Sequence, residues 1–214
     1  AITVNLAPAD LKKEGPAFDL PIALAVVACA EGVTLSRAED CQIIGELALD
    51  GSVRPVKGIL SAAIEAKSRG RKRLLVPSEN ASEAAAVTGI EVFGVSGLRQ
   101  AWDFLRGEKM LEPAVTGSLL HAGKDSYSVD LAEVQGQKHV KRALEIAAAG
   151  SHNLLMVGPP GTGKSMLAKR IPTILPGMTE TESIEVTRVH SIAGQLVPGA
   201  GLLRSRPFRS PHHT

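Results

Sequence analysis

Eight consecutive residues have the types and the spacing of a phosphate-binding loop. They are Gly158, Pro159, Pro160, Gly161, Thr162, Gly163, Lys164 and Ser165, and they fit the pattern G-x-x-x-x-G-K-[ST] at every position. The glycines let the backbone turn so that successive N–H groups point at one phosphate. The lysine reaches the β- and γ-phosphates, and the serine hydroxyl ligates Mg²⁺. The pattern therefore predicts a site for ATP with Mg²⁺, in which Ser165 is the metal ligand.

The residues on both sides of the loop favour this interpretation. Residues 153–157 predict a short apolar strand that leads into the loop, and residues 165–170 predict a helix that leaves it. The N-terminus of that helix adds a partial positive charge where the phosphates would lie. The alternative is a turn rich in glycine and proline with an incidental lysine. A strand before the turn and a helix after it make the phosphate site the better reading.

Hydrolysis of ATP needs further residues that the sequence does not supply after the loop. An ATPase of this type uses an acidic residue at the end of a second apolar strand to hold Mg²⁺ and orient water. The acidic residues after Ser165 are Glu180, Glu182 and Glu185, which lie in a polar segment. The sequence therefore predicts nucleotide binding, with no complete set of catalytic residues in these 214 positions.

The first half of the chain predicts alternating strands and helices. Residues 2–6 alternate with period two and predict a strand, and Asp50-Gly51 predicts a hairpin between residues 43–49 and 53–56. The remaining expected helices are 18–30, 59–69, 78–89 and 98–105, and the remaining strands are 73–76 and 90–95. Strands that alternate with helices indicate an α/β fold.

A linker divides the chain into two expected domains. Residues 108–127 are rich in Gly, Pro, Ser and Thr and show no periodicity. A helix at 137–149 follows, and Gly150 is expected to cap its C-terminus. We therefore expect a first domain at 1–110, a linker at 111–127 and a second domain at 128–214. Both chain ends look cut, because the chain begins inside a strand pattern and stops without a helix end, which suggests a fragment.

Composition excludes several classes of protein. The chain is 44% hydrophobic and 21% charged, which is typical of globular proteins. Its longest apolar stretch, residues 20–30, is about half the ~20 residues of a membrane span, so no membrane partner is expected. The two cysteines form no disulfide framework and predict a reducing, cytoplasmic location. A net charge of +2 makes no case for nucleic acid by itself.

The loop and the residues ahead of it resemble the AAA+ ATPases. Val134-Gln135-Gly136-Gln137 precedes the loop by about 20 residues and is similar to the family segment that packs near adenine. The resemblance implies that Val134 and Gln135 belong to the nucleotide site. A plain helix start at Gly136 is the alternative.

The C-terminal segment is basic. Residues 188–214 hold four arginines, three histidines and no acidic residue, and their glycines and prolines predict a loop. Arg204, Arg206 and Arg209 could contact DNA phosphates. A solvated loop or a contact between subunits explains the same arginines equally well.

Two segments narrow the resemblance to one family. The segment from Ser205 to Thr214, and residues 4–10 followed by 18–22, resemble the YifB/ComM family of magnesium-chelatase-like AAA+ proteins. This resemblance implies a Lon-protease-like α/β domain, similar to ribosomal S5 domain 2, followed by the N-terminal part of a P-loop AAA+ domain that stops before the acidic strand. It also implies a homo-hexamer with ATP, and DNA remodelling or branch migration in natural transformation. A magnesium-chelatase motor subunit and a nucleotide-dependent scaffold are the alternatives.

The first domain resembles the Lon proteolytic domain without its catalytic pair. Residues 45–58 carry the resemblance. Lon enzymes use a serine nucleophile and a lysine base. The position that corresponds to the serine is Ala17, and the position that corresponds to the lysine is Leu60, with Lys57 three residues early. Because a methyl group cannot attack a carbonyl, the domain is expected to be proteolytically inactive.

Overall fold

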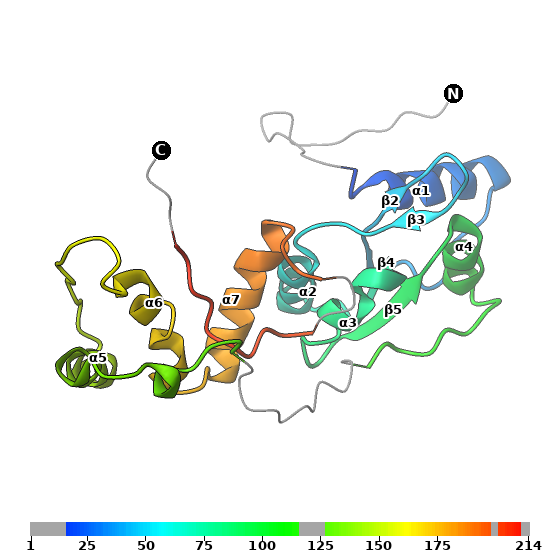
Figure 1. Ribbon diagram of the computed structural model, residues 1–214. Helices are drawn as coiled ribbons and strands as arrows, with labels where there is room; N and C mark the ends of the chain where they lie inside the picture. The colour runs from blue at the N-terminus through cyan, green and yellow to red at the C-terminus, as the bar shows by residue number, and fades with distance from the viewer. Residues whose placement is uncertain (1–15, 116–126, 198–200, 211–214) are drawn as a thin grey trace, which may run out of the picture. The chain divides into compact units, whose positions relative to one another are not determined.

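The computed structural model describes residues 16–115, 127–197 and 201–210, which form two compact units (Figure 1). The first unit comprises residues 1–119 and 185–202, and the second comprises residues 120–184 and 203–214. The two units are therefore interleaved along the chain, whereas the expected boundary at 111–127 is a single division. The strand expected at residues 2–6 lies outside the described residues.

A three-stranded parallel sheet forms the centre of the first unit. Its strands are β1 (Cys41–Ile43), β4 (Arg73–Pro77) and β5 (Glu91–Val95), in the order β1-β4-β5. Leu75 of β4 pairs with Ile43 on one side and with Phe93 on the other. The central strand β4 is buried from Leu74 to Pro77. A continuous apolar run is expected for a parallel strand that is covered on both faces.

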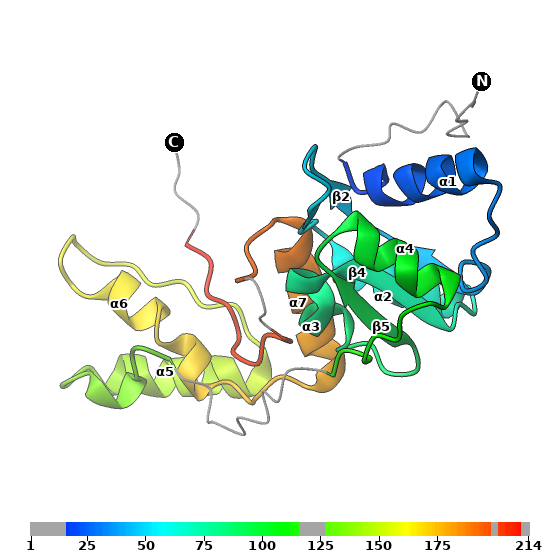
Figure 2. The same ribbon diagram turned by 90° about the vertical axis from the view of Figure 1, so that its right-hand side faces the viewer.

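Alternate residues of β4 and β5 face two separate apolar cores. Leu75, Phe93 and Val95 pack with α1 (Asp19–Glu31) and α4 (Leu98–Arg106), which Figure 2 shows together on one side of the strands. Leu74, Val76 and Val92 pack with α2 (Ile59–Ser68) and α3 (Ala81–Ala84). The 3₁₀ helix η1 (Ser78–Asn80) joins β4 to α3. This mixed α/β architecture with a parallel sheet confirms the coarse fold class.

A short hairpin follows β1, as the Asp50-Gly51 dipeptide predicts. It pairs β2 (Glu46–Leu47) with β3 (Val53–Arg54) in antiparallel fashion, and Gly51 has a φ of 84°, which favours glycine. Asp50 accepts hydrogen bonds from the backbone and the hydroxyl of Ser52, and these bonds lower the pKa of its carboxyl group. The hairpin strands are shorter than the expected 43–49 and 53–56, and Ile43 belongs to β1 of the parallel sheet.

The second unit is built from helices around a small core. Its helices are η2 (Leu131–Glu133), α5 (Lys138–Gly150), α6 (Lys164–Ala168), η3 (Ile171–Ile174) and the start of α7 (Glu180–Ile192). The buried residues of the core are Leu131, Val134, Leu144 and Leu167. Gly150 is the last residue of α5, and the left-handed residue after the helix is Ser151, so the expected capping glycine is wrong by one position.

The strand expected at residues 153–157 does not form. These residues have no regular secondary structure and pair with no strand among the described residues, and Leu155 and Val157 are 86% and 88% exposed. A strand needs hydrogen bonds from a neighbouring strand, and the described part of the second unit offers none. The prediction rests on the apolar side chains of this segment, which do not show whether a neighbouring strand is present to pair with it.

Helix α7 corrects the expectation of a loop that begins at Arg188. The helix extends to Ile192, and its buried side chains are Ser183, Thr187 and Ser191. Because these side chains are hydroxyls, the segment has no apolar periodicity to reveal a helix. A helix start signal is nevertheless present in Thr179 and Glu182, whose side chains form a reciprocal capping box. No helix in the described ranges has the length and hydropathy needed to cross a membrane.

Candidate functional site

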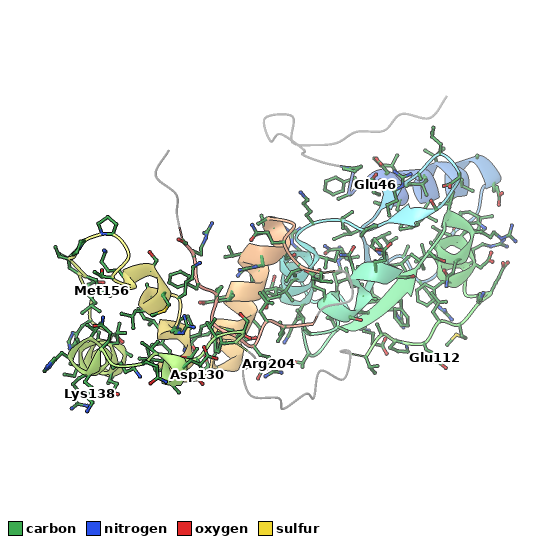
Figure 3. The ribbon with its side chains drawn as sticks, in the orientation of Figure 1. Glu46, Glu112, Asp130, Lys138, Met156 and Arg204 are labelled. Carbon is green, nitrogen blue, oxygen red and sulfur yellow. The ribbon has the colours of Figure 1, made fainter. Side chains whose placement is uncertain are left out.

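The phosphate-binding loop lies between residues 153–157, here called the arm, and helix α6. Figure 3 marks Met156 on the arm and Lys138 at the start of α5. Gly161 and Gly163 have φ values of 81° and 84°, in the left-handed region that a loop of inward-facing N–H groups requires. Gly163 directly precedes α6, so the loop ends at the helix N-terminus. The chain therefore folds locally as the sequence pattern predicts.

The ammonium group of Lys164 lies among oxygen atoms of the loop. Its Nζ donates hydrogen bonds to Gly158 O at 2.7 Å, to Pro159 O at 2.8 Å and to Thr162 Oγ1 at 3.3 Å. The Thr162 hydroxyl in turn donates to Pro159 O at 2.9 Å. The lysine thus occupies the middle of its own loop. Phosphate oxygens are the same class of acceptor with more negative charge, so they suit this ammonium group.

A cavity of about 520 Å³ opens beside the loop, a size within the range of small-molecule sites. Loop residues Gly158, Pro159, Thr162 and Lys164 line one part of it, and apolar residues of α5 and of the arm line another. A cavity with a cationic loop and an apolar wall fits a molecule that carries both phosphates and an aromatic base. The residues present therefore fit a nucleotide.

The other residues expected at the nucleotide site differ in their exposure and in whether they line the cavity. Ser165 is exposed in the first turn of α6, where its hydroxyl is free to ligate a metal ion with the nucleotide. Val134 is buried in the core of the second unit and Gln135 is exposed, and neither lines the cavity. Gln137 and His139, which directly follow that segment, line it instead. The adenine-side role of Val134 and Gln135 stays a prediction.

The three tail arginines have different surroundings. Arg206 Nη2 donates to both carboxylate oxygens of Glu182 at 3.2 and 3.0 Å, and Arg206 Nε donates to Pro176 O at 2.7 Å. The capping bond from Thr179 and the bonds from Arg206 lower the pKa of the Glu182 carboxyl group. Arg204 and Arg209 are exposed and have no ion pair among the described residues. The side chain of Arg206 is thus already engaged within the second unit.

The first unit contains no nucleophile or base at the two positions that correspond to the Lon pair. Ala17 lies two residues before α1, and its carbonyl oxygen accepts a hydrogen bond from Gly45 N at 2.9 Å. Leu60 is the second residue of α2, and its side chain is fully buried in the apolar core that α2 shares with α3. The backbone N–H of Leu60 donates to Glu83 Oε1 at 3.1 Å, and the Ser191 hydroxyl donates to the same oxygen at 2.5 Å. A buried carboxylate therefore ties α2, α3 and α7 together.

Lys57 belongs to a second, smaller cavity in the first unit. This cavity measures about 230 Å³ and its lining includes Lys57, Asn80 and Glu83. The Lys57 side chain packs on Gly194, where an added Cβ would lie 2.5 Å from Lys57 Cε. Both polar side chains already have hydrogen-bond partners. Asn80 accepts from Val56 N and donates to Val56 O, and Glu83 accepts from Leu60 N and the Ser191 hydroxyl. Sequence reasoning missed Glu83, although it is an isolated acid in an Ala-rich segment.

Two family models match the chain. Residues 130–214 match the model described as magnesium chelatase, subunit ChlI, and residues 1–80 match the model described as subunit ChlI of Mg-chelatase. The phosphate-binding loop falls inside the first match, and the Ala17 position falls inside the second. Both models describe the ChlI subunit of magnesium chelatase, and they match different stretches of the chain.

Named relatives match over the whole length of the chain. The competence protein ComM of Haemophilus influenzae is 42% identical over 217 residues, which cover 100% of this chain and 42% of ComM. The protein YifB of Escherichia coli is 43% identical over 218 residues, which cover 100% of this chain and 41% of YifB.

A further relative matches only part of the chain. A Lon protease of Rhizobium meliloti is 31% identical over 86 residues, which cover 40% of this chain and 10% of the protease.

The chain thus spans about two fifths of the length of ComM and YifB, and the matches to them include both units. The glycine loop with its lysine, the two family models and the matches over the whole of this chain agree with one another. The chain belongs to the YifB/ComM family of magnesium-chelatase-like AAA+ proteins.

Proposed function

We propose that this chain supplies the ATP-binding part of an ATP-driven motor that remodels DNA. The observation that carries the proposal is the cavity beside the phosphate-binding loop, with Lys164 at its loop end and an apolar wall opposite. Such a cavity suits a nucleoside triphosphate, because among the described residues that line it there is no Asp or Glu and Lys164 is the one Lys or Arg. The hydrolysis step is assigned to the full-length protein, in which further acidic and arginine residues complete the site.

Magnesium would enter this site with the nucleotide. The Ser165 hydroxyl is the group that would hold it, at the start of α6 and next to Lys164. A bound Mg²⁺ neutralises charge on the β- and γ-phosphates. Around it, Lys164 binds the phosphate oxygens and the loop N–H groups orient them. Within the described ranges no group of three His, Cys, Asp or Glu side chains forms a separate metal site.

DNA is proposed as the partner on two grounds. One relative bears the name competence protein, and competence concerns the uptake of DNA. In this chain, Arg204 and Arg209 are exposed on the segment that follows the first unit's residues 185–202. A homo-hexamer with ATP, as the family resemblance implies, would place several copies of these arginines on one DNA molecule. The free thiols of Cys29 and Cys41 agree with a cytoplasmic location.

The double variant Arg204→Ala/Arg209→Ala tests the DNA contact. If both arginines contact phosphates, the slope of log K against log salt should become less negative by about 1.8, which is two contacts at about 0.9 each. Different DNA sequences should weaken about equally, because phosphate contacts carry no base information. Fluorescence anisotropy with duplex DNA and full-length protein measures both quantities. Arg206 is left intact because it holds Glu182.

The matched control for that experiment is Arg69→Ala, which removes an exposed arginine already paired with Glu65 at 2.6 Å. It should leave the salt slope unchanged. If the double variant instead lowers the hexamer fraction in light scattering with ATP, and the slope of the remaining assembly is unchanged, the arginines serve a subunit contact. DNA would then have to bind elsewhere.

The first unit is proposed to be a Lon-like domain without protease activity. The variant Ala17→Ser should remain unable to cleave casein, because the position of the base is Leu60, which is fully buried in an apolar core. Wild type should also be inert to covalent inhibitors directed at serine. Casein digestion followed by gel electrophoresis is the measurement. Cleavage that disappears on Ser61→Ala would contradict the proposal and would place the nucleophile in α2.

A magnesium-chelatase motor subunit is the second candidate function, because both matching family models carry that description. Such a subunit would use ATP to drive insertion of Mg²⁺ into a porphyrin by partner proteins. The two candidates share the nucleotide site and differ in what stimulates hydrolysis. Stimulation of the ATPase by DNA supports the DNA motor, and stimulation only by chelatase partner subunits supports the alternative.

A further inference from the structure

The cavity of about 230 Å³ in the first unit is lined by side chains of opposite charge. Its residues come from segments 55–57, 79–83 and 191–197, which all belong to that unit. Ala17 and Leu60, the positions that correspond to the Lon pair, do not line it. The ligand of this cavity is therefore a separate question from proteolysis.

Glu83 brings one bound and one unbound oxygen to the cavity. Its Oε1 accepts hydrogen bonds from Leu60 N and from the Ser191 hydroxyl, and these bonds fix the orientation of the carboxylate. Its Oε2 accepts none from the described residues, among which Asp103 Oδ1 is the only fully occluded side-chain atom without a partner. Glu83 Oε2 therefore keeps contact with the cavity that the residue lines. Because Glu83 is only 7% exposed, a positively charged donor in the cavity would stabilise this oxygen.

Lys57 supplies the positive charge of the cavity. Its side chain is exposed and forms no ion pair with a described carboxylate. The lysine stem lies over Gly194, where an added Cβ would be 2.5 Å from Lys57 Cε and 2.9 Å from Nζ. A side chain at position 194 would displace the lysine, so this glycine leaves room for the ammonium group beside the cavity. An ammonium group without a partner suits a carboxylate.

Size and charge limit what the cavity can hold. At ~30 Å³ per water molecule it holds about seven waters, which is the size of a small α-amino acid. Its apolar contacts come from Pro55, Val56, Leu196 and Val197. Two of its three charged side chains are carboxylates, Glu79 and Glu83, which favours a ligand with a positive charge. A metal ion fits less well, because no group of three His, Cys, Asp or Glu side chains in the described ranges is placed to hold one.

We propose that this cavity binds a small aliphatic α-amino acid. The α-ammonium group donates to Glu83 Oε2, the α-carboxylate accepts from the ammonium group of Lys57, and the aliphatic side chain packs on the apolar residues. Each charge of the ligand thus meets an opposite charge that has a free position. The proposal is independent of the nucleotide site, which lies in the second unit.

Three related compounds test which groups of the ligand are recognised. Isothermal titration calorimetry on full-length protein should show binding of L-valine. N-acetyl-L-valine lacks the positive charge and should not bind. L-valinamide keeps the ammonium group and lacks the negative charge, so it should bind about tenfold more weakly than L-valine, the scale of one charge-assisted hydrogen bond.

Two variants assign the two charges to their residues. Lys57→Met keeps most of the apolar stem, and it should weaken L-valine about tenfold and leave L-valinamide unchanged. Glu83→Gln keeps an acceptor for Leu60 N and the Ser191 hydroxyl, and it should weaken both compounds. Trp102 fluorescence checks that Glu83→Gln is folded, and Lys57→Met decides the matter if it is not, because Lys57 is exposed.

Lys67→Met is the matched control, because Lys67 is an exposed lysine of the same unit that does not line the cavity. It should leave the affinity for L-valine unchanged. The proposal is overturned if wild type does not bind L-valine, or if Lys57→Met and Lys67→Met bind it equally well. If L-valinamide binds as tightly as L-valine, the carboxylate contact is wrong, and the ligand is instead the amino terminus of a peptide.

Discussion

Full-length protein carrying Lys164→Ala is expected to lose most of its affinity for Mg-ATP. The lysine Nζ lies 2.7 and 2.8 Å from two carbonyl oxygens of the loop, so its charge is already directed at the site. Its removal deletes a charge-assisted contact to the β- and γ-phosphates, and we expect a loss of about 2–3 kcal/mol in binding free energy. Titration of a fluorescent ATP analogue into both proteins measures this loss.

Lys169→Ala provides the control for charge alone. Lys169 directly follows α6 and is exposed, and it does not line the nucleotide cavity. Its removal should change the affinity by less than about 0.5 kcal/mol, as for other surface substitutions. Equal losses in the two variants would mean that nucleotide is attracted by the overall charge of this region. Equal affinity of wild type and Lys164→Ala would refute the site.

Loss of the Glu83 carboxylate is expected to destabilise the first unit strongly. Glu83 is 7% exposed, and one of its oxygens accepts hydrogen bonds from Leu60 N and from the Ser191 hydroxyl. Glu83→Ala leaves two donors without their acceptor in a buried place. Each such loss costs about 1–3 kcal/mol, so the free energy of unfolding should fall by about 2–6 kcal/mol. Ser191→Ala removes one of these bonds and should cost less.

Trp102 makes this measurement specific to the first unit. It is the only tryptophan of the chain, and it is buried in the core that α1 and α4 share with the sheet. Its fluorescence in a urea titration therefore follows that unit alone. Glu79→Ala, one helical turn earlier and exposed, is the control and should change stability by less than about 0.5 kcal/mol. If Glu83→Ala is as stable as Glu79→Ala, the buried bonds contribute nothing.

Sequence reasoning succeeded where the signal is local. The phosphate-binding loop is contiguous, and every one of its residue types follows from the turn and from the anion, so the pattern itself predicts its backbone. The strand at residues 73–77 and the helices at 19–31 and 59–68 were likewise predicted within one or two residues. In each of these segments the apolar residues alone define which side is buried.

Sequence reasoning failed where the outcome depends on distant residues. Residues 153–157 have a strand-like composition, but no strand among the described residues lies beside them. Helix α7 buries hydroxyl groups, and Ser191 is buried because Glu83, more than a hundred residues earlier, accepts its hydrogen bond. Arg206 was weighed as a DNA or subunit contact because of its charge, and its partner Glu182 was not visible in the pattern.

The interleaving of the two units bears on how such a protein can change during evolution. Residues 185–202 complete the first unit, yet they are encoded after the phosphate-binding loop of the second. A recombination event with one crossover in the linker would therefore transfer an incomplete first unit, and Glu83 would lose the hydroxyl of Ser191. The two units must be inherited together, and substitutions at residue 83 and residue 191 should be selected as a pair.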